Sequence, residues 1–196
     1  MKNTAAGNED QIIAAIRSGN ARAYAVLVDR YKDRALSLAV RLVGDHDEAE
    51  ELVQDAFVNA YRKLDQFRGD ARFGTWLHRI LYNLCMTRVA RRKERMASLD
   101  SLEENPAGML HEDKGPSIQE MVEENELVAL LSDEINRLPE TLKAPLLLFY
   151  VDELKYEEVA EVMNIPMGTV KTYLHRGRNL LRQRMQAKLR NEVEYS

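Results

Sequence analysis

The sequence predicts an all-α protein of two small helical domains joined by a flexible acidic linker. No proline precedes Pro106, and up to that point the apolar residues recur at the three- and four-residue spacing of a helix face. No long stretch alternates apolar and polar residues with the period of two that a half-buried strand requires. The stretch 96–126 is acidic and contains Pro106, Gly108, Gly115 and Pro116, which are typical of a linker.

The distribution of charge agrees with domains at residues 1–95 and 127–196 around a linker at 96–126. The first domain holds 17 lysines and arginines against 13 acids, the linker holds one against nine, and the second domain holds ten of each. Within the second domain, residues 162–191 carry seven basic residues and no acidic one. The net charge of −4 therefore conceals two basic surfaces and an acidic connector.

Three helices are expected in the body of the first domain. The first carries an apolar stripe over residues 24–42 and ends at Gly44, and Asp45 is suited to begin the next helix. The second carries its stripe over residues 49–64, with polar residues on the other side. The third, over residues 76–95, is apolar in its first half and basic in its second. Together these helices predict a bundle.

Four helices are expected in the second domain. A helix that begins near Leu127 is stopped by Pro139, and another runs from about Glu140 to Val151. A short helix over residues 156–163 follows, and a final basic helix starts near Thr169. A tight turn separates the short helix from the basic one.

The residues of this turn predict a helix-turn-helix. Asn164 can adopt the left-handed conformation that ends a helix, and Pro166 prevents the helix from continuing. Val170 and Leu174 then point inward. In such a motif the second helix enters the major groove of duplex DNA, with its first turns at the base edges.

The outward face of the basic helix carries side chains suited to base edges and phosphates. We expect duplex contacts from Thr169, Lys171, Thr172, His175, Arg176, Arg178 and Asn179. The alternative is a solvated basic helix that packs only on its own domain. The turn residues favour DNA binding over that alternative.

Six of the 13 aromatic residues fall within residues 57–82, where basic residues are interleaved with them. Rings beside cations suit unpaired bases, because stacking contributes roughly 1–3 kcal/mol per base whatever the base. We expect Phe57, Tyr61 and much of Trp76 to belong to the core instead. The loop between Phe67 and Phe73 is too polar to be interior, so the core interpretation does not apply to it and it stays a candidate for contact with unpaired bases.

Three segments, taken in order, carry a resemblance to a known family. Residues 47–57 (DEAEELVQDAF) look like the core-binding region of bacterial sigma factors, and residues 67–93 resemble their promoter-melting region. Residues 138–176 resemble their minus-thirty-five-binding domain. Together the segments are similar to the extracytoplasmic-function (ECF, group IV) subfamily, and the resemblance covers residues 20–190. The family implies sigma domain 2 in the first half of the chain and sigma domain 4 in the second.

The resemblance implies a role for each segment. The acidic-polar face that would dock on a basic coiled coil of the polymerase consists of Asp47, Glu50, Glu51, Gln54 and Asp55. Without the resemblance, that face would be interpreted as a solvated helix surface. The residues that would melt the minus-ten element and hold its displaced strand are Arg68, Asp70, Ala71, Arg72, Phe73, Trp76, Arg79, Asn83, Arg88, Arg91 and Arg92. One base of that strand would flip into a pocket near residues 70–73.

The chain departs from the family pattern at three positions. Ala71 stands where the family often has serine, and Asn164 replaces a usual glycine. Lys155 stands where serine or threonine commonly caps the first helix of the motif, and losing such a cap costs ~1 kcal/mol. We expect Asp152 to substitute as the cap.

The resemblance also implies the partners. These are core RNA polymerase, promoter DNA and an anti-sigma factor of a kind that is commonly membrane-anchored, in a stress or envelope response. The two promoter elements lie on the order of 70–80 Å apart. The linker spans about 100 Å fully extended but only ~30 Å as a free coil. The linker therefore suffices only when polymerase holds it stretched, and the free protein should bind promoter DNA poorly.

Composition excludes several other classes. The glycines form no GxGxxG, P-loop or GxSxG motif, and the four histidines lack partners at metal-ligand spacing, so we expect no enzyme, no metal and no cofactor. Cys85 is the single cysteine, so it cannot form an internal disulfide, and it lies on the apolar side of the third helix, so we expect it to be packed rather than redox-active. No secretory signal and no membrane-length apolar run is found, which predicts a cytoplasmic protein without direct membrane insertion.

Two other functions stay open at this stage. A stand-alone helix-turn-helix transcriptional regulator would bind duplex DNA tightly without polymerase. A helical protein-binding adaptor would tolerate alanine at Lys171 and Arg176 without an effect on transcription.

Overall fold

The computed structural model describes residues 4–100 and 124–194. Every regular element within these two ranges is a helix, which confirms the predicted all-α class. None of these helices has both the length and the apolar character needed to cross a bilayer. Most of the predicted linker, residues 101–123, lies outside the described residues, and the domain boundaries at 95 and 127 stay a prediction.

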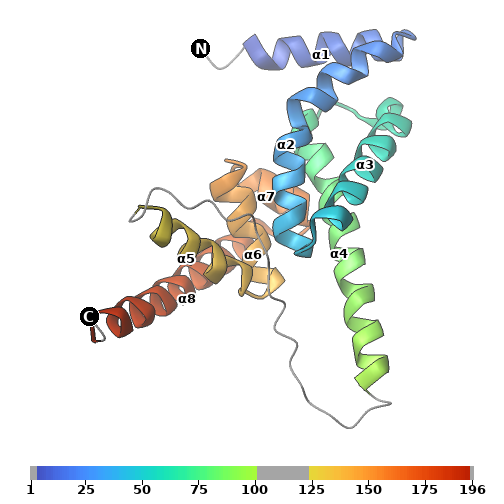
Figure 1. The fold of residues 1–196 in the computed structure, drawn as a ribbon. Coiled ribbons are helices and arrows are strands. Elements are labelled where there is room, and N and C mark those ends of the chain that lie inside the picture. The colour runs from blue at the N-terminus through green and yellow to red at the C-terminus, as the bar shows by residue number, and fades with distance from the viewer. Residues whose placement is uncertain (1–3, 101–123, 195–196) are drawn as a thin grey trace.

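Four helices form an N-terminal bundle (Figure 1): α1 (Thr4–Arg17), α2 (Tyr24–Val43), α3 (His46–Arg62) and α4 (Phe73–Asp100). α2, α3 and α4 pack on one another, and α1 lies across one end of the group. The short 3-10 turns that accompany these helices are Ala21–Ala23 and Leu64–Gln66.

The turn between α2 and α3 has the geometry that its sequence predicts. Gly44 ends α2 in the left-handed conformation, with φ +75°, and its amide donates to the Val40 carbonyl at 2.8 Å. Asp45 caps α3, because its carboxylate accepts a hydrogen bond from the Glu48 amide at 2.8 Å. The cap satisfies an amide that has no partner within the helix. The glycine stop and the aspartate start are both confirmed.

Small residues allow the helices of the N-terminal bundle to approach closely. Ala39 of α2 and both Ala56 and Ala60 of α3 are fully buried, beside larger core residues such as Leu27. Cys85 of α4 is also 0% exposed, and burial raises the pKa of its thiol to about 12. The predicted packed position of Cys85 is therefore confirmed.

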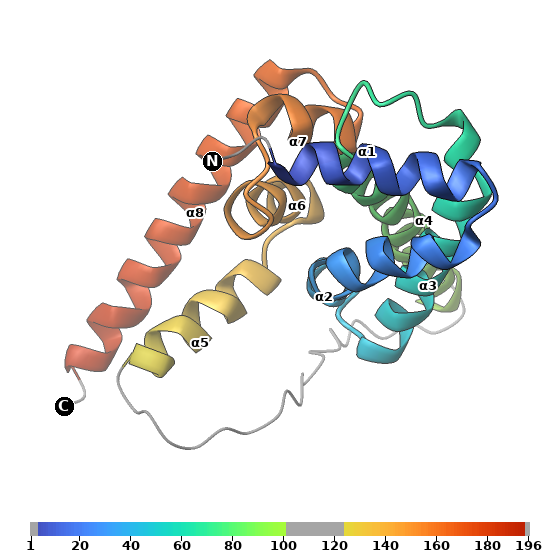
Figure 2. The ribbon, with the colours of Figure 1, turned by 90° about the horizontal axis from the view of Figure 1, so that it is seen from above.

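The C-terminal bundle (Figure 2) contains α5 (Glu124–Asn136), α6 (Glu140–Leu146), α7 (Tyr156–Met163) and α8 (Met167–Glu194). α5 lies beside the second half of α8 in both views. α5, the short helix α7 and the final basic helix α8 lie within a few residues of where the sequence predicts them.

The predicted helix from Glu140 to Val151 is continuous but changes its winding. After α6 it widens into a π-helical turn, Leu147–Val151. Pro145 lies just before this turn, and its backbone nitrogen carries no hydrogen, so it cannot donate the hydrogen bond of an α-helix. A local widening of the helix accommodates such a missing bond.

The two bundles meet where α7 packs on α4. Thr75 of α4 is 1% exposed, and its hydroxyl donates to the Glu158 carboxylate of α7 at 3.3 Å. One turn further along α4, the His78 Nε2 atom lies 3.7 Å from the Asp152 Oδ2 atom. Both side chains are about 95% buried, at 4% and 6% exposure. Among the described residues, Asp152 Oδ2 has no hydrogen-bond partner.

Burial pushes the pKa values of this pair in opposite directions. The pKa of His78 falls to about 4, and that of Asp152 rises to about 7, in both cases because desolvation disfavours the charged form. The contact therefore favours an uncharged imidazole beside a protonated carboxyl group.

Two lysines strengthen the contact between the bundles. Lys143 of α6 is 8% exposed, and its ammonium donates to the Arg41 carbonyl of α2 at 3.2 Å. Burial lowers the pKa of Lys143. Lys93 of α4 forms an ion pair with Glu140 of α6 at 2.9 Å. The interface thus extends from α7 to the start of α6.

The substitution D152N is expected to raise the free energy of unfolding at pH 8 by about 1–3 kcal/mol, because it removes a buried, unsatisfied negative charge. The folded form prefers protonated Asp152, so the wild-type protein recovers this loss as the pH falls from 7 towards 4. The advantage of D152N should shrink over that interval.

Chemical denaturation between pH 4 and pH 8 measures the effect. Asp133→Asn, on the exposed side of α5, is the matched control and should show no such pH dependence. A D152N protein that is less stable than wild type at pH 8 would contradict the assignment.

Candidate nucleic-acid interface

The turn between α7 and α8 is that of a helix-turn-helix. Asn164 adopts the left-handed conformation, with φ +54°, and the Ile165 amide donates to the Ala160 carbonyl at 3.1 Å. The Thr169 amide then donates to the Pro166 carbonyl at 2.9 Å, which closes the first turn of α8. The predicted stop at Asn164 is confirmed, and α8 begins at Met167, two residues earlier than predicted.

The cap of α7 differs from the expectation. Asp152 does not cap this helix, because it is buried against His78. Lys155 makes no cap hydrogen bond with its side chain, and only the reciprocal half of a capping box is present: the Glu158 carboxylate accepts a hydrogen bond from the Lys155 amide at 2.9 Å. A glutamate in the third position of a helix can reach back in this way, so a lysine at the N-cap does not leave the Lys155 amide unsatisfied.

The inner face of α8 fixes the helix on the bundle. Val170 and Leu174 are 0% and 2% exposed, as predicted. Gly177 is buried against α6, and a Cβ atom there would lie 2.8 Å from Leu146 Cδ1. The absence of a side chain at Gly177 therefore lets α6 and α8 pack closely at this point.

The outer face of α8 presents the side chains predicted to contact duplex DNA. Thr169 is half-buried, and the exposed ones are Lys171, Thr172, His175, Arg176, Arg178 and Asn179. Two contacts hold parts of this face in place. The Thr172 hydroxyl donates to the Gly168 carbonyl at 2.9 Å, and the Asn179 amide lies 3.0 Å from the His175 Nε2 atom.

The basic residues of α8 divide into two sets. Arg184 and Lys188 turn towards Glu134 of α5, at 3.6 and 2.8 Å, and this glutamate is only 3% exposed. The Lys188 hydrogen bond lowers the pKa of Glu134. Near the start of α8, Lys171 lies 5.8 Å from the Tyr156 ring centre and stays exposed. The second half of the basic run thus stabilises the bundle, and the first half faces outward.

The loop between the 3-10 turn and α4 is polar and exposed, as predicted. Arg68, Asp70 and Arg72 all face solvent, and Gly69 provides a left-handed turn with φ +78°. Ala71 is half-buried. This loop is called the arginine loop (residues 68–72) below.

Two buried rings anchor the arginine loop. Phe67 and Phe73, at its ends, are 7% and 1% exposed, with ring centres 6.1 Å apart. Trp76 is half-buried, and its ring centre lies 5.1 Å from that of Phe67. Phe73, which was predicted to contact the melted strand, therefore supports the loop from inside. Trp76 is the aromatic side chain that stays partly accessible.

A cavity of about 170 Å³ lies beside the arginine loop and is lined by Asp70, Trp76 and Arg79, among others. Glu161 of α7 also lines this cavity, so the C-terminal bundle reaches the same place. A partly exposed ring, a carboxylate and an arginine together suit a polar heteroaromatic ligand such as a nucleobase.

The predicted basic residues further along α4 are not equivalent. Arg79, Asn83 and Arg91 are exposed. Arg88 pairs with Glu48 of α3 at 3.1 Å, and Arg92 also pairs with Glu48. The hydrogen bond to Glu48 raises the pKa of Arg88. Arg88 and Arg92 must exchange this partner before they can hold a phosphate, whereas Arg79 and Arg91 need not.

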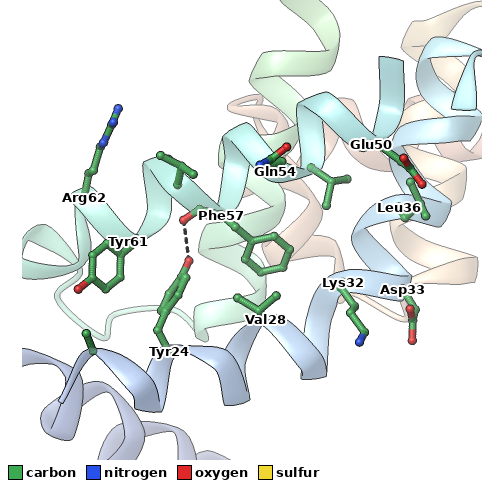
Figure 3. A pocket seen from close by; sticks show the side chains of 13 residues that line it. Tyr24, Val28, Lys32, Asp33, Leu36, Glu50, Gln54, Phe57, Tyr61 and Arg62 are labelled. Carbon is green, nitrogen blue, oxygen red and sulfur yellow. Dashed lines mark hydrogen bonds between the residues drawn. The ribbon is translucent and has the colours of Figure 1, made fainter. Parts of the chain in front are cut away.

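A second surface lies on the opposite side of the N-terminal bundle, where α2 and α3 border an apolar groove of about 650 Å³ (Figure 3). Val28, Phe57 and Tyr61 lie along it, with Glu50 and Gln54 at one side. The other residues that line it are Ala21, Tyr24, Lys32, Asp33, Leu36, Val53, Val58 and Arg62.

Tyr61 is 43% exposed in this groove, so its expected place in the core is wrong. The Tyr24 hydroxyl donates to the Phe57 carbonyl at 2.7 Å, and the Tyr24 and Tyr61 rings meet edge to face with centres 4.9 Å apart. Tyr61 thereby lies at the end of the groove and packs against Tyr24 on one side only.

All the residues predicted to face polymerase are exposed on α3: Asp47, Glu50, Glu51, Gln54 and Asp55. Glu50 and Gln54 border the groove, whereas Glu51 lies 3.7 Å from Arg88 on the other side. The apolar lining was not predicted as a site. The sequence feature that points to this groove is Val58, an apolar residue outside the apolar stripe of α3. In the structure it is 40% exposed.

The fold and its exposed basic helix define a helix-turn-helix DNA-binding protein. Two family profiles match the chain, "Sigma-70 region 2" over residues 27–95 and "Sigma-70, region 4" over residues 129–181. The ECF RNA polymerase sigma factor SigW of Bacillus subtilis (strain 168) is 36% identical over 177 residues, covering 88% of this chain and 94% of that protein. The chain belongs to the ECF RNA polymerase sigma factors.

A second similar sequence supports the same family, and a solved structure supports the same fold. The ECF RNA polymerase sigma-E factor of Escherichia coli (strain K12) is 35% identical over 187 residues, covering 92% of this chain and 96% of that protein. The solved structure of CnrH in complex with the cytosolic domain of CnrY has the same fold, with a TM-score of 0.64 and 24% identity over 90% of this chain and 96% of that one.

The close packing at Gly177 can be tested with a pair of glycine substitutions. Gly168→Ala should be neutral or stabilising, because a Cβ atom there meets nothing within 4 Å and alanine favours a helix by up to about 1 kcal/mol. Gly177→Ala should be less stable than Gly168→Ala by about 2 kcal/mol, because overpacking against Leu146 outweighs the same gain. Thermal or urea denaturation compares the two. Equal stabilities would show that α8 does not depend on this contact.

Proposed function

We propose that this ECF sigma factor binds core RNA polymerase and directs it to promoters with a duplex minus-thirty-five element and a meltable minus-ten element. One observation carries the proposal: a single chain presents an exposed recognition helix and an arginine loop beside a partly exposed Trp76. A helix of this kind fits the major groove, and rings beside arginines fit unpaired bases.

The first turns of α8 hold the minus-thirty-five duplex. Thr172, one turn before the adjacent His175 and Arg176, faces outward with them, and all three are suited to base edges. Lys171 and Arg178 flank them and are suited to phosphates, which fix the register of the helix on the duplex. Arg184 and Lys188 do not take part, because Glu134 holds them.

The arginine loop captures the minus-ten element after melting. One base of the displaced strand enters the cavity between Asp70, Trp76 and Arg79, where stacking and phosphate contacts offset the cost of flipping, a few kcal/mol. Asn83 and Arg91 follow along α4 and hold the same strand. Arg88 and Arg92 join them only after they release Glu48.

The groove between α2 and α3 binds an apolar helix face of the polymerase coiled coil. Val28, Val58 and Tyr61 provide the apolar contact, and Glu50 and Gln54 face basic residues at the border. An apolar centre with a charged border is the usual arrangement of a stable protein interface. Glu51 and Asp55 extend the acidic surface beyond the groove.

The packing of α7 on α4 supports a requirement for polymerase. In this arrangement Glu161 lines the cavity that the flipped base would enter. The two DNA-binding surfaces are also held in one compact unit, whereas the promoter elements lie on the order of 70–80 Å apart. The bundles therefore separate when polymerase binds, and the free chain binds promoter DNA poorly.

An anti-sigma factor is the proposed regulator. The related CnrH is seen with the cytosolic domain of CnrY. By analogy, a membrane-anchored partner covers the polymerase and DNA surfaces of this chain, which acts in the cytoplasm in a stress or envelope response.

Run-off transcription with core polymerase on genomic fragments tests the proposal. Wild-type chain should start transcripts at defined sites, and Arg176→Ala should reduce them by about tenfold, because one base contact contributes about 1–3 kcal/mol of discrimination. Arg190→Ala is the control, since Arg190 is exposed on the same helix roughly 21 Å further on. Failure to initiate from any fragment refutes the proposal. Tight specific binding to duplex without polymerase would indicate a stand-alone regulator instead.

The groove is tested by charge insertion. Val58→Glu places a carboxylate in the apolar lining and should weaken the affinity for core polymerase at least tenfold, as measured by fluorescence anisotropy. Val26→Glu is the matched control, because Val26 is 47% exposed on α2 but does not line the groove. Equal affinities of the two variants would exclude the groove from the interface.

A further inference from the structure

We propose that α1 holds both ends of the arginine loop, and that Arg17 and Tyr31 are positioning residues for promoter melting. The inference rests on the proposed function of the loop. It assigns a role to α1, which precedes the residues that the region 2 profile matches, and to Tyr31, which no predicted site includes.

Arg17, the last residue of α1, fixes the beginning of the loop. Its Nη2 atom donates to the Leu64 carbonyl at 2.8 Å and also to the Phe67 carbonyl. Leu64 is the first residue of the 3-10 turn Leu64–Gln66 and Phe67 directly follows that turn, so both carbonyls lie just before the arginine loop. A charged donor shared between two backbone acceptors holds the direction in which the chain enters the loop.

Tyr31 of α2 fixes the end of the loop. Its hydroxyl donates to the carboxylate of Glu9 on α1, which also accepts from Arg30 at 2.9 Å. The Tyr31 ring lies against the start of α4. Its centre is 5.7 Å from the centre of the Phe73 ring, and a Cβ atom at Gly74 would lie 2.6 Å from the Tyr31 Cε1 atom. Burial and the Glu9 contact raise the pKa of Tyr31, so the hydroxyl keeps its proton and stays a donor.

Buried side chains seat α1 firmly enough to act as a clamp. Ile13 and Ile16 are 4% and 8% exposed, and Glu9 is 9% exposed. A cavity of about 150 Å³ lies between α1 and the loop, lined by Ile13, Arg17 and Gly69 among others. The loop is therefore backed by α1 rather than packed tightly into the core. Its conformation then depends on the Arg17 hydrogen bonds at its beginning and on the Tyr31 ring, which the Glu9 hydrogen bond holds against Phe73, at its end.

Correct placement matters because the loop must offer its cavity to a base at the moment of melting. A geometric error of about 1 Å in such a site can cost about a hundredfold in rate. Loss of either attachment should thus impair the opening of duplex DNA. It should impair much less the use of DNA that is already open, because a preformed bubble removes the cost of unstacking.

Arg17→Ala and Tyr31→Phe test the clamp in the full chain bound to core polymerase. Each variant is assayed on a duplex promoter and on the same promoter with a preformed minus-ten bubble. Both should lower initiation from the duplex about tenfold, the effect expected for one charge-assisted hydrogen bond, and should approach wild type on the bubble. Affinity for core polymerase should stay unchanged.

Arg22→Ala is the control, because Arg22 is exposed in the 3-10 turn that follows α1, and its substitution removes the same charge as Arg17→Ala does. It should match wild type on both templates. Tyr31→Phe leaves the net charge unchanged, so its defect separates positioning from direct attraction of Arg17 to phosphate. A general loss of stability would reduce initiation from duplex and bubble alike.

Three results overturn the clamp. They are wild-type initiation by both variants on duplex DNA, an equal loss on both templates, and a defect confined to Arg17→Ala. Each presupposes that wild-type chain initiates. If it does not, the proposed function fails first.

Discussion

The packing of α7 on α4 is the contact on which the overall arrangement depends. α7 is the first helix of the helix-turn-helix, and α4 carries the arginine loop at its start. The contact buries His78 and Asp152 side by side, and hydrogen-bonds Thr75 to Glu158. Buried ionisable groups without full hydrogen bonding lower the stability of an interface. The contact between the bundles is thus extensive, but the burial of this pair lowers its stability.

Charge has two uses in this chain, which the sequence alone does not distinguish. Glu134 holds Arg184 and Lys188, and Glu48 holds Arg88 and Arg92. Those four cations form part of the scaffold of the two bundles. The start of α8 and the arginine loop keep exposed cations, and others, such as Arg22 and Arg190, face solvent elsewhere. A count of basic residues therefore overstates the surface available to phosphates, and buried or half-buried acids determine by how much.

Local chemistry explains which features could be predicted from sequence. Gly44 and Asp45 define a helix boundary by backbone preference and capping, and Asn164 with Pro166 defines the turn in the same way. These effects act over a few neighbouring residues, so the sequence is sufficient to predict them. The polarity of the arginine loop is likewise local, and its exposure follows.

The remaining features depend on residues far apart in the chain. Tyr61 lines the groove between α2 and α3 and packs against Tyr24 on one side only, and no periodicity of α3 reveals this. Asp152 resembled a helix cap until His78, 74 positions earlier, proved to be its neighbour. Arg17 contacts carbonyls 47 and 50 residues away. Such pairings arise from tertiary packing, which hydrophobic spacing constrains only loosely.

The position of Cys85 gives the molecule an internal reporter. It is the one cysteine of the chain, it is fully buried in α4, and its thiol has a pKa of about 12. Alkylating reagents attack the thiolate, so the closed bundle is almost inert to them. Reaction requires the packing around α4 to loosen, and the labelling rate then measures how often that happens. Because α7 packs on the same helix, the labelling rate of Cys85 in the wild-type chain can report how often α4 opens locally in the presence of polymerase or DNA.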